Sequence, residues 1–114
     1  MSTPVPNPTE FQILLALAGQ DRHGYGIIQE ISRQSGGLNR MGPGTLYGGI
    51  KRMRAAGWIT DAGGSGGEKE DSRRTCHYKL TRAGRVAAGE AATRMADIVS
   101  IAASLGLVTL KRSH

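Results

Sequence analysis

The segment GPGTLYGGIKRMRAAGWI, residues 42–59, gathers side chains that suit contact with an anion. Lys51, Arg52 and Arg54 stand close together in it. Ammonium and guanidinium groups donate hydrogen bonds to phosphate oxygens and to the acceptor edges of bases. The pattern therefore indicates binding to a nucleic acid or another anionic partner.

A helix that starts at Gly42 as N-cap and Pro43, and ends at Gly57, is predicted for this segment. Its apolar arc, which should face the core, consists of Leu46, Ile50, Met53 and Gly57. The opposite arc consists of Gly44, Gly48, Lys51, Arg52 and Ala55, with Thr45 and Tyr47 at its edges. A glycine inside a helix costs roughly 1 kcal/mol relative to alanine. We interpret Gly48 as a means of bringing the backbone close to a DNA groove; relief of crowding between helices is the alternative, and it suits Gly49 better.

The basic residues are concentrated in the middle of the chain. The 114 residues carry a formal net charge of +6, and ten of the fifteen lysines and arginines lie between Arg40 and Arg85, against four acidic residues there. A chain of this length predicts one small domain. The charge favours an anionic partner, although a basic surface that contacts only solvent is the alternative that charge alone leaves open.

The residues that could carry catalysis or bind a metal do not indicate an enzyme. Cys76 is the only cysteine, which excludes a disulfide within the chain, and together with His77 it supplies too few ligands for a metal site. The stretch GGSGGEKED lacks the Gly-Lys-Ser/Thr ending of a phosphate-binding loop. We therefore predict no enzymatic activity, no metal and no cofactor. His23 is expected to act as a helix cap or turn residue, and Trp58 to lie in the core.

The order of the elements predicts a mainly α-helical fold with a small β-hairpin wing, that is, a winged helix-turn-helix followed by a long C-terminal dimerisation helix. The expected divisions are a disordered tail (1–8), the DNA-binding domain (9–80), the dimerisation helix (81–108) and a frayed tail (109–114). Residues 58–62 and 75–80 are predicted to be the strands of the wing, because Tyr78 and Leu80 alternate with Lys79 as in a half-buried strand.

The helices on either side of this segment are predicted from their caps and apolar patterns. In residues 9–19, Thr9 is the candidate N-cap. The expected core face of this helix consists of Phe11, Leu14, Leu15 and Ala18. That of the second helix consists of Tyr25, Ile28 and Ile31. Thr81 is the candidate cap of the last helix, which should run from residue 82 to about 105.

The last helix carries an apolar seam that predicts a second copy of the chain as partner. Alternating three- and four-residue steps connect Ala88, Ala91, Met95, Ile98, Ala102 and Leu105. Val99, Ile101 and Leu107 widen this stripe beyond what one side of a small domain can cover. The expected homodimer would present two recognition helices to half-sites about 34 Å apart on a roughly palindromic operator.

Four motifs follow one another along the chain: HGYGI (23–27), GTLYGGIKRM (44–53), AAGWI (55–59) and YKLTRAGR (78–85). In this order and spacing they resemble the PadR-like transcriptional regulators, relatives of the phenolic-acid-decarboxylase repressor, over residues 9–106. The resemblance implies a bacterial, homodimeric winged-helix repressor with its third helix in the major groove and its wing near the DNA backbone. The single short C-terminal helix is similar to the small-bodied branch of the family. Gly48 departs from the proline that many members have there, which affects the contacts of this helix more than the fold.

The resemblance implies groove-facing positions for Thr45, Tyr47 and Lys51, while Arg73 and Arg74 at the foot of the wing are candidate phosphate contacts. For Tyr47, a hydrogen bond to phosphate and packing against the wing are both open. The predicted DNA-binding residues are Gly44, Thr45, Tyr47, Gly48, Lys51, Arg52, Arg73 and Arg74.

Other partners are constrained by what the chain lacks. Residues 81–114 contain no Phe, Trp or Tyr, so we expect no site that sandwiches a flat ligand between aromatic rings. Whether the protein binds any small-molecule effector is left open by the sequence. No signal peptide fits the first residues, and the apolar run 98–110 is too short for a membrane span. A cytoplasmic protein without a membrane partner is expected. Because fold alone does not prove DNA binding, the alternative function is a winged-helix protein-interaction module without specific DNA binding.

Overall fold

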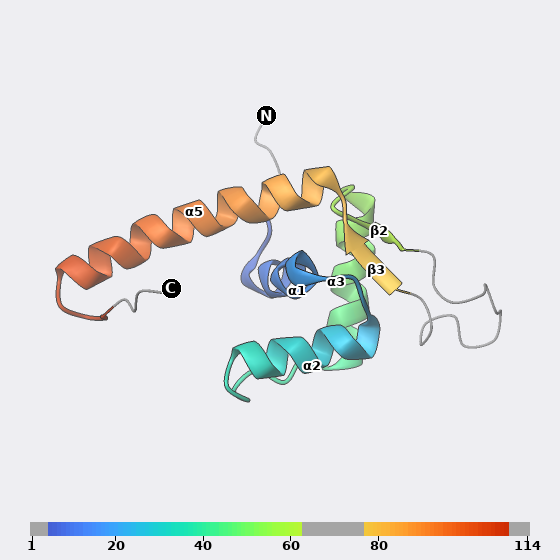
Figure 1. Cartoon of the computed structure of the whole chain (residues 1–114), viewed down its shortest axis with the longest axis horizontal. Helices are drawn as coiled ribbons and strands as arrows, with labels where there is room; N and C mark the ends of the chain where they lie inside the picture. The colour runs from blue at the N-terminus through green and yellow to red at the C-terminus, as the bar shows by residue number, and fades with distance from the viewer. Residues whose placement is uncertain (1–4, 63–76, 110–114) are drawn as a thin grey trace.

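The computed structural model describes residues 5–62 and 77–109. In chain order they form α1 (Pro8–Gly19), β1 (Arg22–His23), α2 (Gly24–Gln34), α3 (Pro43–Ala55), β2 (Ile59–Asp61), β3 (His77–Leu80) and α5 (Arg82–Ser104) (Figure 1). The described strands make one antiparallel sheet in the order β1-β3-β2. This helix-rich fold with a small β wing confirms the predicted fold class.

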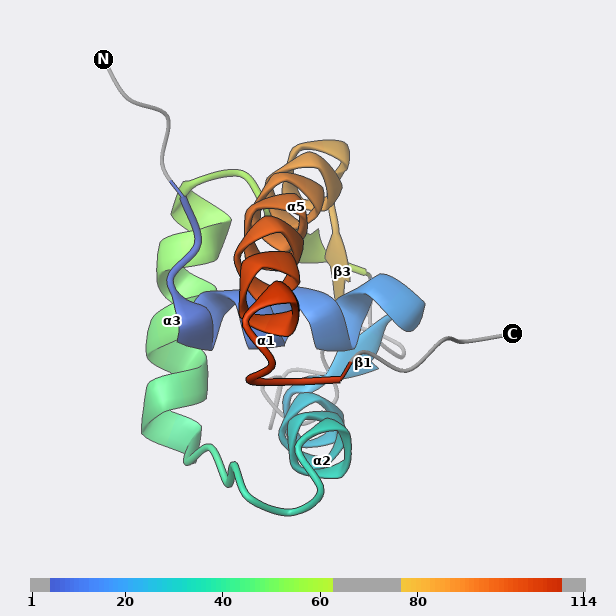
Figure 2. The same cartoon turned by 90° about the vertical axis from the view of Figure 1, so that its left-hand side faces the viewer.

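The hydrophobic core surrounds α1, which contacts α2, α3, α5 and β3. Figure 1 shows α5 and α2 on opposite sides of α1, and Figure 2 shows α3 against the N-terminal part of α1. The largest fully buried side chains are Ile13, Leu14, Leu17, Ile27, Ile31, Leu46, Met53 and Ile59. Trp58 is buried, as the sequence predicts. Helices α1, α2 and α3, the sheet and the first turns of α5 therefore share one core.

The start and the core face of α3 agree with the sequence. Gly42 is the N-cap and Pro43 the first helical residue, where the missing N–H of proline costs no intrahelical hydrogen bond. The predicted core residues Leu46, Ile50 and Met53 are all buried. Gly57 does not belong to that core face: it is exposed, and its φ of +83° ends the helix in a conformation that glycine adopts without strain.

The first two helices differ from the sequence-based expectations. Asn7, not Thr9, caps α1, because the Asn7 side chain accepts a hydrogen bond from the Glu10 N–H at 2.8 Å, and the helix begins within the segment expected to be a tail. The residues of α1 that are buried are Glu10, Ile13, Leu14, Ala16 and Leu17. Apart from Leu14, the predicted core residues line a shallow groove with α5 instead, namely Phe11, Leu15 and Ala18. Tyr25 in α2 is exposed, and Ile27 is buried in its place. A helix that is apolar on several sides does not show from its own sequence which side meets which neighbour.

Strand β1 is an element that the sequence does not predict. It pairs Arg22 with Tyr78 and His23 with His77. Two polar residues have no alternation that could predict a strand. The pairing positions His23 as the N-cap of α2, where its Nδ1 accepts a hydrogen bond from the Gly26 N–H at 3.0 Å, and this confirms the predicted cap.

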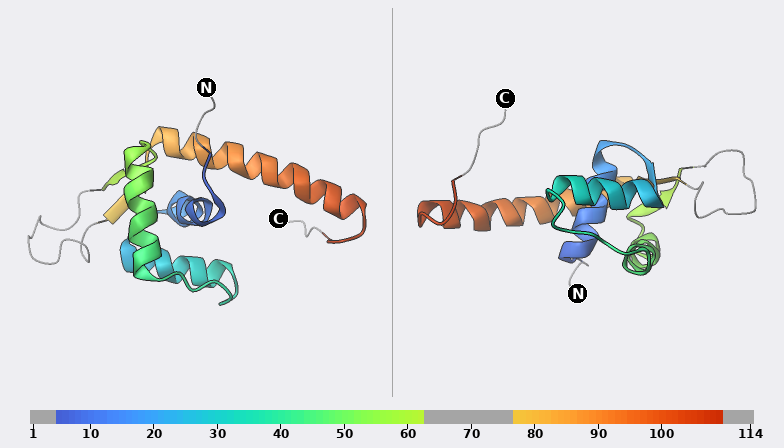
Figure 3. Two further views of the ribbon diagram at one scale, coloured as in Figure 1. Left: turned by 180° about the vertical axis from the view of Figure 1, so that it is seen from behind. Right: turned by 90° about the horizontal axis from the view of Figure 1, so that it is seen from below.

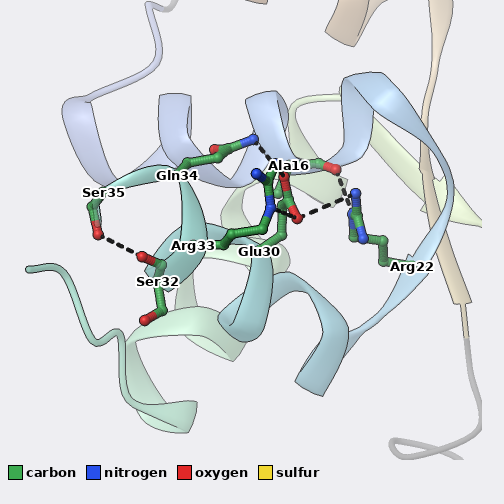
Figure 4. A network of polar contacts seen from close by, with 7 residues as sticks. All are labelled: Ala16, Arg22, Glu30, Ser32, Arg33, Gln34 and Ser35. Atoms are coloured by element: carbon green, nitrogen blue, oxygen red, sulfur yellow. Dashed lines mark hydrogen bonds and ion pairs between the residues drawn. The ribbon is translucent and has the colours of Figure 1, made fainter. Parts of the chain in front are cut away.

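A buried carboxylate ties α2 to the end of α1 (Figure 4). Glu30 is held by Arg33 and Gln34 of its own helix and by Arg22, whose Nη2 lies 3.6 Å from its Oε1. Arg22 also donates from Nε to the Ala16 carbonyl at 2.8 Å. The hydrogen bond from Arg33 is the main reason that the pKa of Glu30 is lowered from 4.5 to about 2. Glu30 is therefore ionised at neutral pH.

Helix α5 is joined to the core only by its first turns. Thr81 caps it, as predicted, by accepting from the Gly84 N–H at 3.0 Å. Gly84, Ala87 and Ala91 are buried, and the helix then runs away from the three-helix body (Figure 1). A Cβ at Gly84 would lie 2.0 Å from the Trp58 carbonyl oxygen, so this contact requires glycine. In the described part of the chain, no helix has the length and apolarity that crossing a membrane requires.

Candidate nucleic-acid interface

Helix α3 lies on an outer face of the molecule, and Figure 3 (left) shows it in front of α1. Gly44, Thr45, Lys51, Arg52 and Ala55 are exposed on it, and Gly48 is half-buried. The structure thus brings six of the seven residues of the predicted outward arc together on one exposed side. We call these six residues the outward face of α3. Arg73 and Arg74, the wing residues predicted to contact phosphate, lie outside the described residues.

Tyr47 has a different position. It is half-buried and packs against the core. A Cβ at Gly24 would lie 2.2 Å from the Tyr47 hydroxyl oxygen, so the ring crosses the first residue of α2 closely. The sequence leaves packing against the wing open for Tyr47, whereas the structure shows that Tyr47 packs on the start of α2. Tyr47 therefore sets how α2 and α3 lie against each other, and a phosphate contact by its hydroxyl stays a prediction.

Arg54 connects α3 to the wing. Its Nη2 lies 2.7 Å from Asp61 Oδ1 of β2, and its guanidinium carbon lies 5.6 Å from the centre of the Tyr78 ring on β3. Cation–π contacts form at such distances. The sequence could not assign this role, since nothing local in residues 42–59 indicates that Asp61 and Tyr78 lie beside Arg54.

Arg52 connects α3 to α1. Its Nε donates to Glu10 Oε2 at 3.0 Å, and only 10% of the Glu10 side chain is exposed, compared with 58% of the Arg52 side chain. Arg52 is thus part of the outward face and also has a partner within the protein. Among the described residues, Lys51 has no ion-pair partner, and its ammonium group is available to a ligand.

The two adjacent glycines of α3 have different surroundings. A Cβ at Gly49 would lie 3.0 Å from Cδ1 of the buried Ile13, so close packing of α1 on α3 favours glycine there. A Cβ at Gly48 would meet only Arg52 Nη1, at 3.8 Å, which is an ordinary van der Waals distance. Helix crowding accounts for Gly49 and does not account for Gly48.

The predicted dimer seam divides into two parts. Ala91 is 3% exposed and Ala88 packs against the core, so the first part contacts the chain's own body. The second part is open to solvent, and its large exposed side chains are Met95, Ile98, Ile101, Leu105 and Leu107. Phe11 and Leu15 of α1 join Met95 in an open groove of about 400 Å³, which the sequence does not predict because its periodicity assigns both residues to the core.

The family model of the PadR-like family of transcriptional regulators matches residues 13–90. The chain belongs to this family. It is a family of transcriptional regulators. This PadR-like chain is also 35% identical over 79 residues to an uncharacterized 37.1 kDa protein in transposon TN4556 of Streptomyces fradiae. The match covers 69% of the chain but 20% of that protein, so the chain spans about a fifth of the length of the curated relative.

Solved structures share the fold of the PadR-like chain. A PadR family transcription regulator from hypervirulent Clostridium difficile R20291 superposes with a TM-score of 0.65 at 23% identity, covering 87% of this chain and 98% of that one. Bacillus subtilis PadR, in complex with operator DNA, superposes with a TM-score of 0.61 at 21% identity, covering 74% of this chain and 46% of that one.

Proposed function

We propose that this PadR-like chain is a sequence-specific transcriptional repressor that binds double-stranded DNA as a homodimer, with α3 in the major groove. The observation that carries the proposal is the outward face of α3, which combines small residues with two cations and no acidic side chain. A duplex carries one negative charge per roughly 1.7 Å of its axis, so an acid-free basic face suits it. A function on DNA also implies the bacterial cytoplasm as its location.

The start of α3 supports the same role. Gly42 makes no side-chain cap hydrogen bond, so the first N–H groups of the helix are not satisfied by a capping side chain. These groups and the helix dipole attract phosphate. Bacillus subtilis PadR has a similar fold and binds operator DNA, which supports the same use of α3 in this chain.

The exposed half of α5 supports a homodimer. Ile98 is 66% exposed, and the neighbouring large apolar side chains of the seam are exposed with it. Monomeric proteins rarely expose contiguous apolar patches beyond several hundred Å². A second copy would cover this seam by the same surface, because a two-fold interface is self-complementary. The two copies of α3 would then meet half-sites about one helical turn apart.

The test is selection of binding duplexes from a random-sequence pool by the full chain, followed by mobility shifts with the selected duplex and a scrambled one. We expect tighter binding of the selected duplex. If Lys51 contacts phosphate, Lys51→Ala should weaken binding to both duplexes equally and lower the salt slope by about one. If Lys51 contacts a base, the loss should be confined to the selected duplex. Arg94→Ala on α5 removes one exposed positive charge away from α3 and serves as the control.

Three outcomes would contradict the proposal. Equal binding of selected and scrambled duplexes would exclude a sequence-specific regulator, and absence of any shift would favour the protein-interaction alternative. A wild-type chain that sediments as a monomer at micromolar concentration would exclude the arrangement with two half-sites. Both measurements use the intact chain.

A further inference from the structure

Arg52 is held in one orientation by a carboxylate from another helix. Glu10 Oε2 accepts from Arg52 Nε at 3.0 Å, while Glu10 Oε1 accepts from the Asn7 N–H at 3.0 Å in the capping box of α1. Glu10 is therefore fixed at both oxygens and is largely buried. It cannot follow a moving guanidinium without breaking the cap of α1.

The end of the guanidinium that carries Nη1 and Nη2 lies beside the two adjacent glycines of α3. A Cβ at Gly48 would lie 3.8 Å from Nη1, and a Cβ at Gly49 would lie 3.8 Å from Nη2. Neither glycine has a side chain that could cover this end. With Nε engaged by Glu10, Nη1 and Nη2 form the pair of donors that a ligand can approach.

We propose that Glu10 orients Arg52 so that Nη1 and Nη2 donate to O6 and N7 of one guanine in the major groove. This inference rests on the proposed function, and it assigns Arg52 as a specificity-determining residue and Glu10 as the residue that positions it. Two parallel N–H donors match the two acceptors that guanine presents in that groove. Gly48 leaves room for the base edge beside the guanidinium, because a Cβ there would meet only Arg52 Nη1 within 4 Å.

A base contact suits this arrangement better than a phosphate contact does. A phosphate contact depends mainly on positive charge and accepts many directions of approach, and an adjacent carboxylate partly neutralises that charge. A base contact depends on direction, which the carboxylate supplies. Lys51 has the opposite properties, a flexible point charge with no ion-pair partner among the described residues, and is the better phosphate contact.

The experiment uses the full chain and the duplex obtained by selection, with every base pair replaced in turn. Wild type should prefer guanine at one position by roughly 5- to 150-fold over the other bases. Arg52→Lys, which keeps the charge, should abolish the preference at that position only. Glu10→Gln should reduce it, because the amide oxygen can still accept from the Asn7 N–H in the capping box, whereas the amide nitrogen cannot accept from Arg52 Nε. Arg33→Lys alters a comparable ion pair on α2 and should change no preference.

A second arm replaces guanine by 7-deazaguanine, which lacks the N7 acceptor. The analogue at the preferred position should weaken binding by wild type and leave binding by Arg52→Lys unchanged. This arm still tests the inference in wild type if a variant does not fold, which circular dichroism would reveal.

Several results would overturn the inference. If Arg52→Lys loses affinity equally for all duplexes, Arg52 is a phosphate contact. If the variants melt at a lower temperature but keep every base preference, the ion pair only stabilises the packing of α1 on α3. Wild-type binding that tolerates 7-deazaguanine at every guanine would also exclude it. If Arg52→Lys keeps every base preference of wild type, only this inference is overturned. If wild type itself shows no base preference, the proposed function is overturned as well.

Discussion

Replacing Gly48 by alanine distinguishes the effect of this glycine on the stability of the free protein from its effect on DNA affinity. The added Cβ would meet only Arg52 Nη1, at 3.8 Å, so the folded chain should accept it without rearrangement. Alanine in a helix interior is favoured over glycine by roughly 1 kcal/mol. For 114 residues, an unfolding entropy of about 2.1 cal/mol/K per residue turns this gain into a rise in melting temperature of about 4 °C. The free protein should therefore become more stable.

The same change should weaken operator binding, because the methyl group lies on the face that is to approach the groove. Calorimetry measures the first effect, and mobility shifts with the selected duplex measure the second. Gly89→Ala is the control, since Gly89 lies inside α5, is exposed, and would place its new Cβ in open space, with nothing within 4 Å apart from the backbone of its own helix. It should give a similar gain in stability with unchanged DNA affinity. A Gly48→Ala protein that is more stable and binds as tightly as wild type would refute close approach as the reason for this glycine.

Three further changes test other parts of the structure. Gly84→Ala should lower the unfolding free energy by roughly 1–3 kcal/mol, because its Cβ would lie 2.0 Å from the Trp58 carbonyl oxygen; an unchanged or higher melting temperature would contradict this contact. Glu30→Gln should destabilise the fold at neutral pH. Because the pKa of Glu30 is lowered from 4.5 to about 2, the stability that its ionised form contributes is fully present above pH 4.5 and is lost as the pH falls toward 2. Urea unfolding at several pH values should show that the difference in unfolding free energy between variant and wild type shrinks over that interval. A difference that does not change with pH would contradict this role of Glu30. Ile98→Glu should dissociate the proposed dimer, since it places like charges and an unpaired carboxylate in an apolar contact; sedimentation velocity would detect it, and a dimer of unchanged affinity would place the interface elsewhere.

Several features of the protein follow from the sequence because they depend on neighbouring residues. Gly42 and Pro43 start α3 and Thr81 caps α5, since capping involves groups within one helical turn. The core face of α3 follows from helical spacing, and the alternation of Tyr78, Lys79 and the half-buried Leu80 follows from the pleat of a strand. The charge of α3 is likewise a property of its sequence alone.

The tertiary structure decided which of these residues are free to act. Arg52 and Glu10 are 42 residues apart, and only the packing of α3 on α1 makes them an ion pair. Packing on α2 likewise brings Tyr47 over Gly24. The tertiary structure also decided that Phe11 and Leu15 line a groove, because α1 is apolar on more sides than its neighbouring helices cover. Periodicity identifies the faces of a helix, but the partner of each face depends on elements distant in the chain, and therefore on the fold as a whole.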